Sequence, residues 1–92
     1  MFRLCGKLFK ENRMIKDFVA ENPDPALNRT RKIFAGLEQL CREFDLSVPI
    51  WLDTTIEDFK LHSKARFYQD SFIEHIDFDF LEIQVIEEDD TI

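Results

Sequence analysis

The segment Pro25–Phe44 reads PALNRTRKIFAGLEQLCREF and gives the clearest structural signal in the chain. Its apolar residues recur at intervals of three, four and seven positions, which is the repeat of one face of an α-helix. They are Leu27, Phe34, Leu37, Cys41 and Phe44, and Ile33 and Leu40 widen the stripe. The pattern predicts an amphipathic helix from Pro25 to Phe44, with Asn22 or Asp24 as its cap and the following proline in the first turn.

The residues before this helix predict a β-hairpin. Apolar and polar positions alternate along Phe2–Lys10, and a second apolar-rich run covers Met14–Val19, as expected for two strands. The polar residues Lys10–Arg13 would form the turn between them. Gly6, inside the first strand, would mark a bulge or a close approach of backbone, and Gly36 would mark close packing of the helix.

The residues after the helix predict a second one. Pro49 ends the first helical region, and a helix is expected from about Thr55 to Ser63, with Thr54 and Glu57 at the spacing of a capping box. Two apolar stripes then diverge, and one straight helix cannot turn both toward one core. The sequence therefore leaves two structures open for residues 64–76: a bend followed by another helix, or an extended segment.

The last element is a predicted strand at residues 78–86, where β-branched and aromatic residues alternate in part with acids. The order ββααβ predicts an α+β fold of two layers. We expect a small antiparallel sheet, formed by the N-terminal hairpin and the C-terminal strand, packed on two or three helices. One domain would span residues 1–86, and residues 87–92, which begin with four consecutive acids, would form an acidic disordered tail.

Charge is distributed unevenly along the chain, whose net charge is −7. Residues 1–44 hold nine Lys and Arg against six Asp and Glu, whereas residues 45–92 hold three against thirteen. If the first and last strands are neighbours, opposite charges face each other and help to set the register. The residues concerned are Arg3, Lys7 and Lys10 on the first strand, and Asp79, Glu82 and Glu87 on the last.

The basic front half also defines an alternative function, nucleic-acid binding. The hairpin and the start of the first helix would supply Lys7, Lys10, Arg13, Lys16, Arg29, Arg31 and Lys32. The overall negative charge opposes this function, because long-range repulsion slows the approach to a polyanion.

Metal-ligating side chains gather in the last third of the chain. The candidates are His62, Asp70, Glu74, His75, Asp77 and Asp79. Their spacing matches none of the common ligand pairs, and two aspartates at alternate strand positions are typical of a solvated face. The sequence therefore predicts no metal site, with His62, His75, Asp77 and Asp79 as the residues that would form one.

Nothing in the sequence assembles a catalytic motif. Cys5 and Cys41 have neither metal-binding nor redox spacing, so we expect reduced thiols and leave a disulfide between them open. The two glycines, Gly6 and Gly36, belong to no phosphate-binding loop. We therefore expect no enzymatic activity and no cofactor.

Three short stretches resemble a family of short uncharacterised proteins from anaerobic Gram-positive bacteria. They are Trp51–Asp53, Lys64–Asp70 and Asp77–Ile83, which read WLD, KARFYQD and DFDFLEI. The resemblance covers most of the chain. It implies a bacterial, cytosolic origin and transfers no catalytic or binding residue.

The functional expectation is a non-enzymatic protein-interaction module or a homodimer. The chain shows no signal peptide and no apolar run that would span a membrane, which predicts a soluble, cytoplasmic protein. Partner contacts are expected at Trp51, because tryptophan is enriched at energetic hot spots, and at Arg66 and Tyr68. The edge strands of a small sheet would also be open to pairing with another chain.

Overall fold

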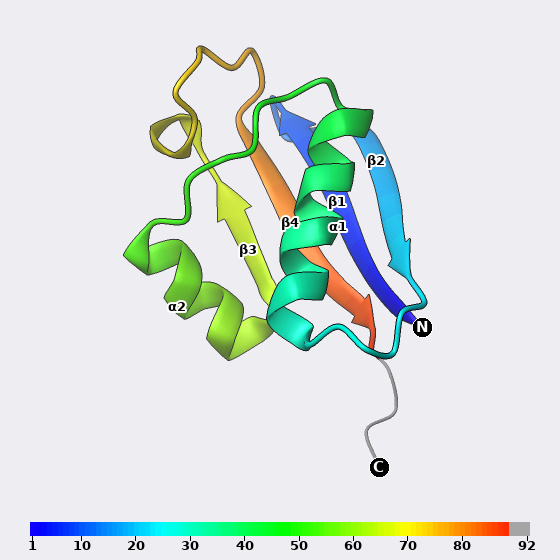
Figure 1. The fold of residues 1–92 in the computed structure, drawn as a ribbon. Coiled ribbons are helices and arrows are strands. Elements are labelled where there is room, and N and C mark those ends of the chain that lie inside the picture. The colour runs from blue at the N-terminus through cyan, green and yellow to red at the C-terminus, as the bar shows by residue number, and fades with distance from the viewer. Residues whose placement is uncertain (89–92) are drawn as a thin grey trace.

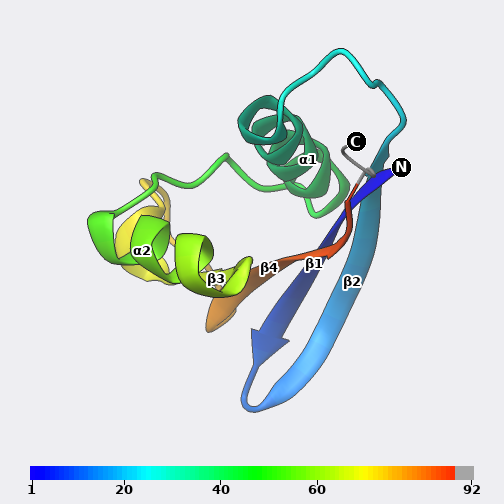
Figure 2. The same ribbon diagram turned by 90° about the horizontal axis from the view of Figure 1, so that it is seen from below.

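A computed structural model describes residues 1–88, in which four strands form one antiparallel sheet of order β2-β1-β4-β3 (Figure 1). The elements follow along the chain as β1 (Phe2–Lys10), β2 (Arg13–Asn22), α1 (Arg29–Glu43), α2 (Asp53–His62), β3 (Lys64–Phe67), the short 3-10 helix η1 (Gln69–Ser71) and β4 (Phe80–Glu87). Both α-helices lie on the same face of the sheet (Figure 2). This arrangement confirms the predicted two-layer α+β class, with one strand more than expected.

The additional strand, β3, settles the two readings of residues 64–76. Residues Lys64–Phe67 are extended and pair with β4, with Lys64 opposite Gln84 and Phe67 opposite Leu81. The 3-10 turn η1 follows, and no further α-helix is present in this part of the described chain. The sheet therefore has β2 and β3 as its edges.

Alternation of side chains gives the sheet one covered face and one helix-free face. Phe2, Leu4 and Leu8 of β1 are buried beneath the helices, whereas the intervening residues, among them Arg3 and Lys7, are only partly buried. α1 packs on β1 and β2, and α2 packs on β3. The core thus lies between the helices and one side of the sheet.

The starts of both helices differ from the prediction. α1 begins at Arg29, not Pro25, and its cap is Asn28, whose side chain accepts a hydrogen bond from the Arg31 backbone N–H at 2.9 Å. Asn22 and Asp24 instead hold the loop before it, because their side chains accept hydrogen bonds from backbone N–H groups two residues further on. α2 begins at Asp53 without a side-chain cap, so the expected capping box is absent.

The two glycines confirm the close packing expected of them. A Cβ atom built on Gly6 would lie 2.8 Å from both Leu40 methyl groups, and one built on Gly36 would lie 3.0 Å from a Leu4 methyl group. Each glycine therefore faces the leucine of the other element. The pair sets how closely α1 approaches β1.

The opposite charges of the two chain halves meet inside the fold, although not all in the expected pairs. β1 and β4 are neighbours, and Arg3 forms ion pairs with Glu87 at 3.2 Å and with Glu21 of β2 at 3.0 Å. Lys7 lies opposite Glu82 in the register. Asp79 pairs with no lysine of β1; its carboxylate accepts a hydrogen bond from the Glu11 backbone N–H at 2.8 Å.

The end of the described chain enters the expected tail. β4 extends to Glu87, one residue beyond the predicted domain limit, and the Glu88 carboxylate lies 2.6 Å from Arg29 Nε. Residues 89–92 of the predicted tail lie outside the described residues. Among the helices of the described chain, none has the length and apolar character needed to cross a bilayer.

Candidate binding groove

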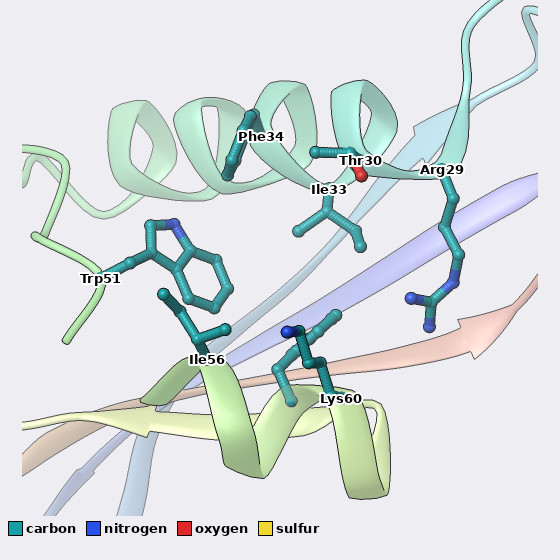
Figure 3. Close-up of a pocket in the computed structure, with 8 residues that line it drawn as sticks. Arg29, Thr30, Ile33, Phe34, Trp51, Ile56 and Lys60 are labelled. Carbon is teal, nitrogen blue, oxygen red and sulfur yellow. The ribbon is translucent and has the colours of Figure 1, made fainter. Parts of the chain in front are cut away.

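An apolar groove of about 310 Å³ lies between α1 and α2 (Figure 3). Its lining comes from both helices and from the connector between them: Arg29, Thr30, Ile33, Phe34, Trp51, Ile56, Phe59 and Lys60. A volume near 300 Å³ is at the lower end of the range for ligand-binding clefts. The groove is therefore large enough to receive one or two apolar side chains of another molecule.

Trp51 holds the connector against the inner part of this groove. Its ring makes edge-on contacts with Phe67 of β3, at 5.0 Å between centroids, and with Phe59 of α2, at 5.6 Å. Aromatic pairs of this geometry contribute about 0.5–1.5 kcal/mol beyond the area that they bury. The tryptophan thus couples α2 to the sheet and leaves its remaining surface toward α1.

Phe34 forms the outer wall of the groove and is 51% exposed. The sequence pattern placed Phe34 in the core, which is wrong, whereas Ile33, Leu37 and Leu40 of the same predicted stripe are buried. Ile33 and Phe34 are neighbours on the helix and point 100° apart, so the sheet can cover only one of them. The Phe34 ring lies 6.2 Å from that of Trp51, edge-on, and both rings line the groove.

The other end of the groove is cationic, with Arg29 on α1 and Lys60 on α2 (Figure 3). The Arg29 guanidinium lies 5.7 Å from the centre of the Phe59 ring, donates a hydrogen bond to Ser63 Oγ at 3.1 Å and pairs with Glu88. Glu88 is thus a carboxylate of the chain itself that is bound at this end. The groove as a whole runs from an aromatic end to a positively charged end.

Further exposed aliphatic side chains lie in the connector before Trp51 and in the loop after η1. Ile50 and Val48 of the connector are each 51% exposed, and Ile73 is 92% exposed. The connector and the loop after η1 lie side by side, because the Ile50 backbone N–H donates to the Ser71 carbonyl at 2.7 Å. None of these three side chains lines the groove itself, and singly exposed apolar groups are common on protein surfaces.

The residues expected to bind nucleic acid do not gather on one surface. Lys10 and Arg13 face each other at the turn of the hairpin, whereas Arg29 and Arg31 lie in the first turn of α1, at the opposite end of the sheet (Figure 1). Lys32 is only 5% exposed. Lys7 and Lys16 lie on β1 and β2 between these two ends.

Two of the three expected partner-binding residues lie away from the groove. Arg66 and Tyr68 contact Phe80 on the helix-free side of β4, with the guanidinium carbon 4.5 Å and the tyrosine ring 5.5 Å from the Phe80 ring centre. Phe9 stacks on the same ring at 5.0 Å. Hydrogen bonds to Tyr68 and then to Glu82 raise the pKa of Arg66.

Glu82 is the buried acid of this helix-free face, with 6% of its surface exposed. Its carboxylate lies 3.1 Å from Arg66 Nε and 3.6 Å from Lys64 Nζ. A buried carboxylate is costly without such partners. The contacts among Arg66, Tyr68, Phe80 and Glu82, here called the Arg66 cluster, therefore have a structural role, because Arg66 compensates the buried charge of Glu82.

The candidate metal ligands are dispersed. His62 ends α2, Asp70 lies in η1, and Asp79 is hydrogen-bonded to the hairpin turn. Glu74 accepts a hydrogen bond from the Ser47 backbone N–H at 3.2 Å, in the same loop as His75 and Asp77. Within residues 1–88 no three His, Cys, Asp or Glu side chains are placed to hold one ion.

The two cysteines are free thiols. Cys41 lies in the core, where burial, and to a smaller extent Glu38, raises its pKa to about 11. Burial also raises the pKa of Cys5, against the opposing effect of Lys7. Both groups are therefore protonated and poorly nucleophilic near neutral pH.

Sequence reasoning identified Trp51 but missed the rest of the groove. The width of the apolar stripe on α1 was recognised, but not its consequence, which is that Ile33, Phe34 and Leu37 cannot all face a single sheet. Ile56 and Phe59 of α2 carry the matching signal on the other wall.

Comparison with models of protein families, with curated proteins and with solved structures finds no match for this chain.

Proposed function

We propose that this chain is a non-enzymatic protein-interaction module, and that its partner inserts apolar side chains at the outer, aromatic part of the groove between α1 and α2. The observation that carries the proposal is the half-exposed Phe34 ring on the wall of an apolar groove. A large aromatic side chain exposed beside a concave apolar surface has the composition and shape of an interface hot spot.

The charges around the groove define the chemistry of the partner. Arg29, Arg31 and Lys60 stand at or beside its cationic end. A partner with acidic side chains would complement this end. Glu88 supports this, because it is a carboxylate of the chain itself that is bound to Arg29. We therefore expect a partner segment in which apolar side chains are accompanied by carboxylates. Such charge complementarity raises the association rate and the specificity of binding more than it raises the affinity.

Site-directed photo-crosslinking tests this function. The photoreactive amino acid p-benzoylphenylalanine replaces Thr30 at the groove rim in the full-length chain, expressed in the cells that naturally make it. Irradiation is expected to produce one dominant protein adduct, whose band is lost when Phe34→Asp is added. The same reporter at Glu11, in the hairpin turn, is the matched control and is expected to give no such adduct.

The second variant separates loss of binding from loss of folding. Because the Phe34 side chain is half exposed, Phe34→Asp is expected to keep the circular dichroism spectrum and a cooperative thermal transition. Adduct formation that is equal at positions 30 and 11, or that persists in a folded Phe34→Asp protein, contradicts the proposed function.

A further inference from the structure

We propose that the partner of this surface is a second copy of the chain, packed α1 against α1 in antiparallel orientation about a twofold axis between residues 34 and 35. The inference rests on the function proposed above and names its partner. Most dimers of identical chains have twofold symmetry, in which one surface patch meets itself. The patch must therefore be complementary to its own rotated image.

The charges of α1 meet this requirement. Arg31 and Glu38 are both exposed and stand seven residues apart, which is two turns and about 10 Å along one side of the helix. Within residues 1–88, neither side chain takes part in an ion pair. Because the two positions are equidistant from the proposed axis, Arg31 of each copy lies opposite Glu38 of the other, and the rotation forms two equivalent pairs.

The side chains nearest the axis are apolar. Phe34 is 51% exposed and Ala35 is partly buried. The two Phe34 rings would meet on the side of the groove, where a second ring can also cover Trp51, and the two Ala35 methyl groups would meet on the other side. Small residues at the crossing point allow two helices to approach closely, so that the larger side chains beside them interlock. A shallow depression next to Phe34, lined by Leu27, Arg31, Ala35 and Glu38 among others, leaves room for the second helix.

The edges of the sheet are less suited to pairing two copies. The ladder between β1 and β2 shifts register after Leu8, so that β2 is irregular at Ile15. Lys16 follows Ile15 directly, and Arg13 lies two residues before it. The other edge, β3, has four residues, and Lys64 and Arg66 point from it to the helix-free side. A bulge, a short strand and basic side chains are the features by which native proteins prevent edge pairing. The exposed face of α1 is therefore better suited to form an interface between two copies than the sheet edges β2 and β3.

Charge exchange across the axis tests the inference. Analytical ultracentrifugation of the wild-type chain, at concentrations up to about 100 µM, is expected to show a monomer–dimer equilibrium. Arg31→Glu and Glu38→Arg each place two pairs of like charges at the interface, and each is expected to raise the dimer dissociation constant at least about tenfold. The double variant restores opposite charges and is expected to dimerise like the wild type.

Mixing the two single variants gives a sharper readout. In the mixed dimer, both positions of one chain are acidic and both positions of the other are basic, so every contact is attractive. An equimolar mixture is therefore expected to form a heterodimer, although each variant alone is monomeric. Arg13→Glu, a reversal of the same kind in the hairpin turn, is the matched control and is expected to dimerise normally.

Two results would overturn the inference: a wild-type chain that stays monomeric over the whole concentration range, or folded single variants whose charges fail to complement on mixing. Either result leaves the proposed function open to its own test. A Phe34-dependent adduct with a different protein would then keep the module and replace its partner, whereas the absence of any Phe34-dependent adduct would remove the function itself.

Discussion

At the scale of single residues, the two glycines have unequal roles although both lie where α1 crosses β1. The Cβ missing from Gly6 would lie 2.8 Å from two Leu40 atoms, which is a steric overlap, and Leu40 is fully buried with little room to move. The contact at Gly36 is looser, at 3.0 Å to a Leu4 methyl group and 3.3 Å to the Leu4 Cβ atom, although Leu4 is equally buried. Gly36 also lies inside a helix, where alanine is favoured over glycine by about 1 kcal/mol.

We therefore expect Gly6→Ala to destabilise the protein more than Gly36→Ala. Overpacking of a dense core costs about 1–3 kcal/mol, so the free energy of unfolding of Gly6→Ala should fall by that amount. In Gly36→Ala, the gain in helix propensity offsets a smaller clash, and the net change should be under about 1 kcal/mol. Urea denaturation of both variants measures the difference, and equal losses would contradict the steric interpretation.

At the scale of elements, the helices and the hairpin follow from local pattern, whereas their ends and their exposed faces do not. The periodicity of residues 25–44 was sufficient to predict α1. It did not locate the first turn, because Asn22, Asp24 and Asn28 are all chemically suitable caps and only the path of the loop selects Asn28. It did not identify Phe34 as exposed, because which part of a wide apolar arc faces the sheet depends on the helix's orientation.

The strand β3 shows a second limit of local pattern. Ala65 and Phe67 are buried and alternate with Lys64 and Arg66, so the period of a strand is present. Four residues are too few to separate this period from that of a helix. Pairing with β4 decides the outcome, and that pairing joins residues distant in sequence. The Arg66 cluster on the helix-free face follows from the same pairing and was unpredictable for the same reason.

The cap of α1 gives a prediction at this scale. Asn28→Ala removes the side chain that accepts from the Arg31 backbone N–H, and loss of such a cap costs about 1 kcal/mol. Thr54→Ala, in the first turn of α2, removes an exposed side chain in a helix that has no side-chain cap and should change stability by less than about 0.5 kcal/mol. Thermal denaturation of both variants checks this, and a larger loss in Thr54→Ala would refute it.

At the scale of the whole molecule, the sheet order places the first and last strands side by side in the centre. β1 and β4 pair along nearly their full length, and the amino group of Met1 lies 3.5 Å from the Glu87 carboxylate. The start of the chain and the end of β4 are thus neighbours. The hairpin turn at Glu11 and Asn12, by contrast, is exposed and joins only β1 to β2.

This closeness predicts that the chain tolerates circular permutation. A variant that begins at Asn12, ends at Glu11 and connects Ile92 to Met1 through a short Gly-Ser linker should keep a cooperative transition, because every strand pair is retained. Opening the chain between Ile83 and Gln84 instead interrupts a central strand and should prevent folding. Circular dichroism and thermal melts compare the two, and a permutant opened at the turn that fails to fold would contradict the expectation.

The central position of β4 also has a consequence for how the protein is made in the cell. A ribosome synthesises β1 well before β4, and Phe9 pairs with Phe80 across about seventy intervening residues. Until β4 emerges from the exit tunnel, one side of β1 has no neighbour, and the nascent chain exposes Leu4 and Leu8 next to an open strand edge. The sheet can therefore close only after β4 has been synthesised, and until then chaperones that hold nascent chains have access to this hairpin.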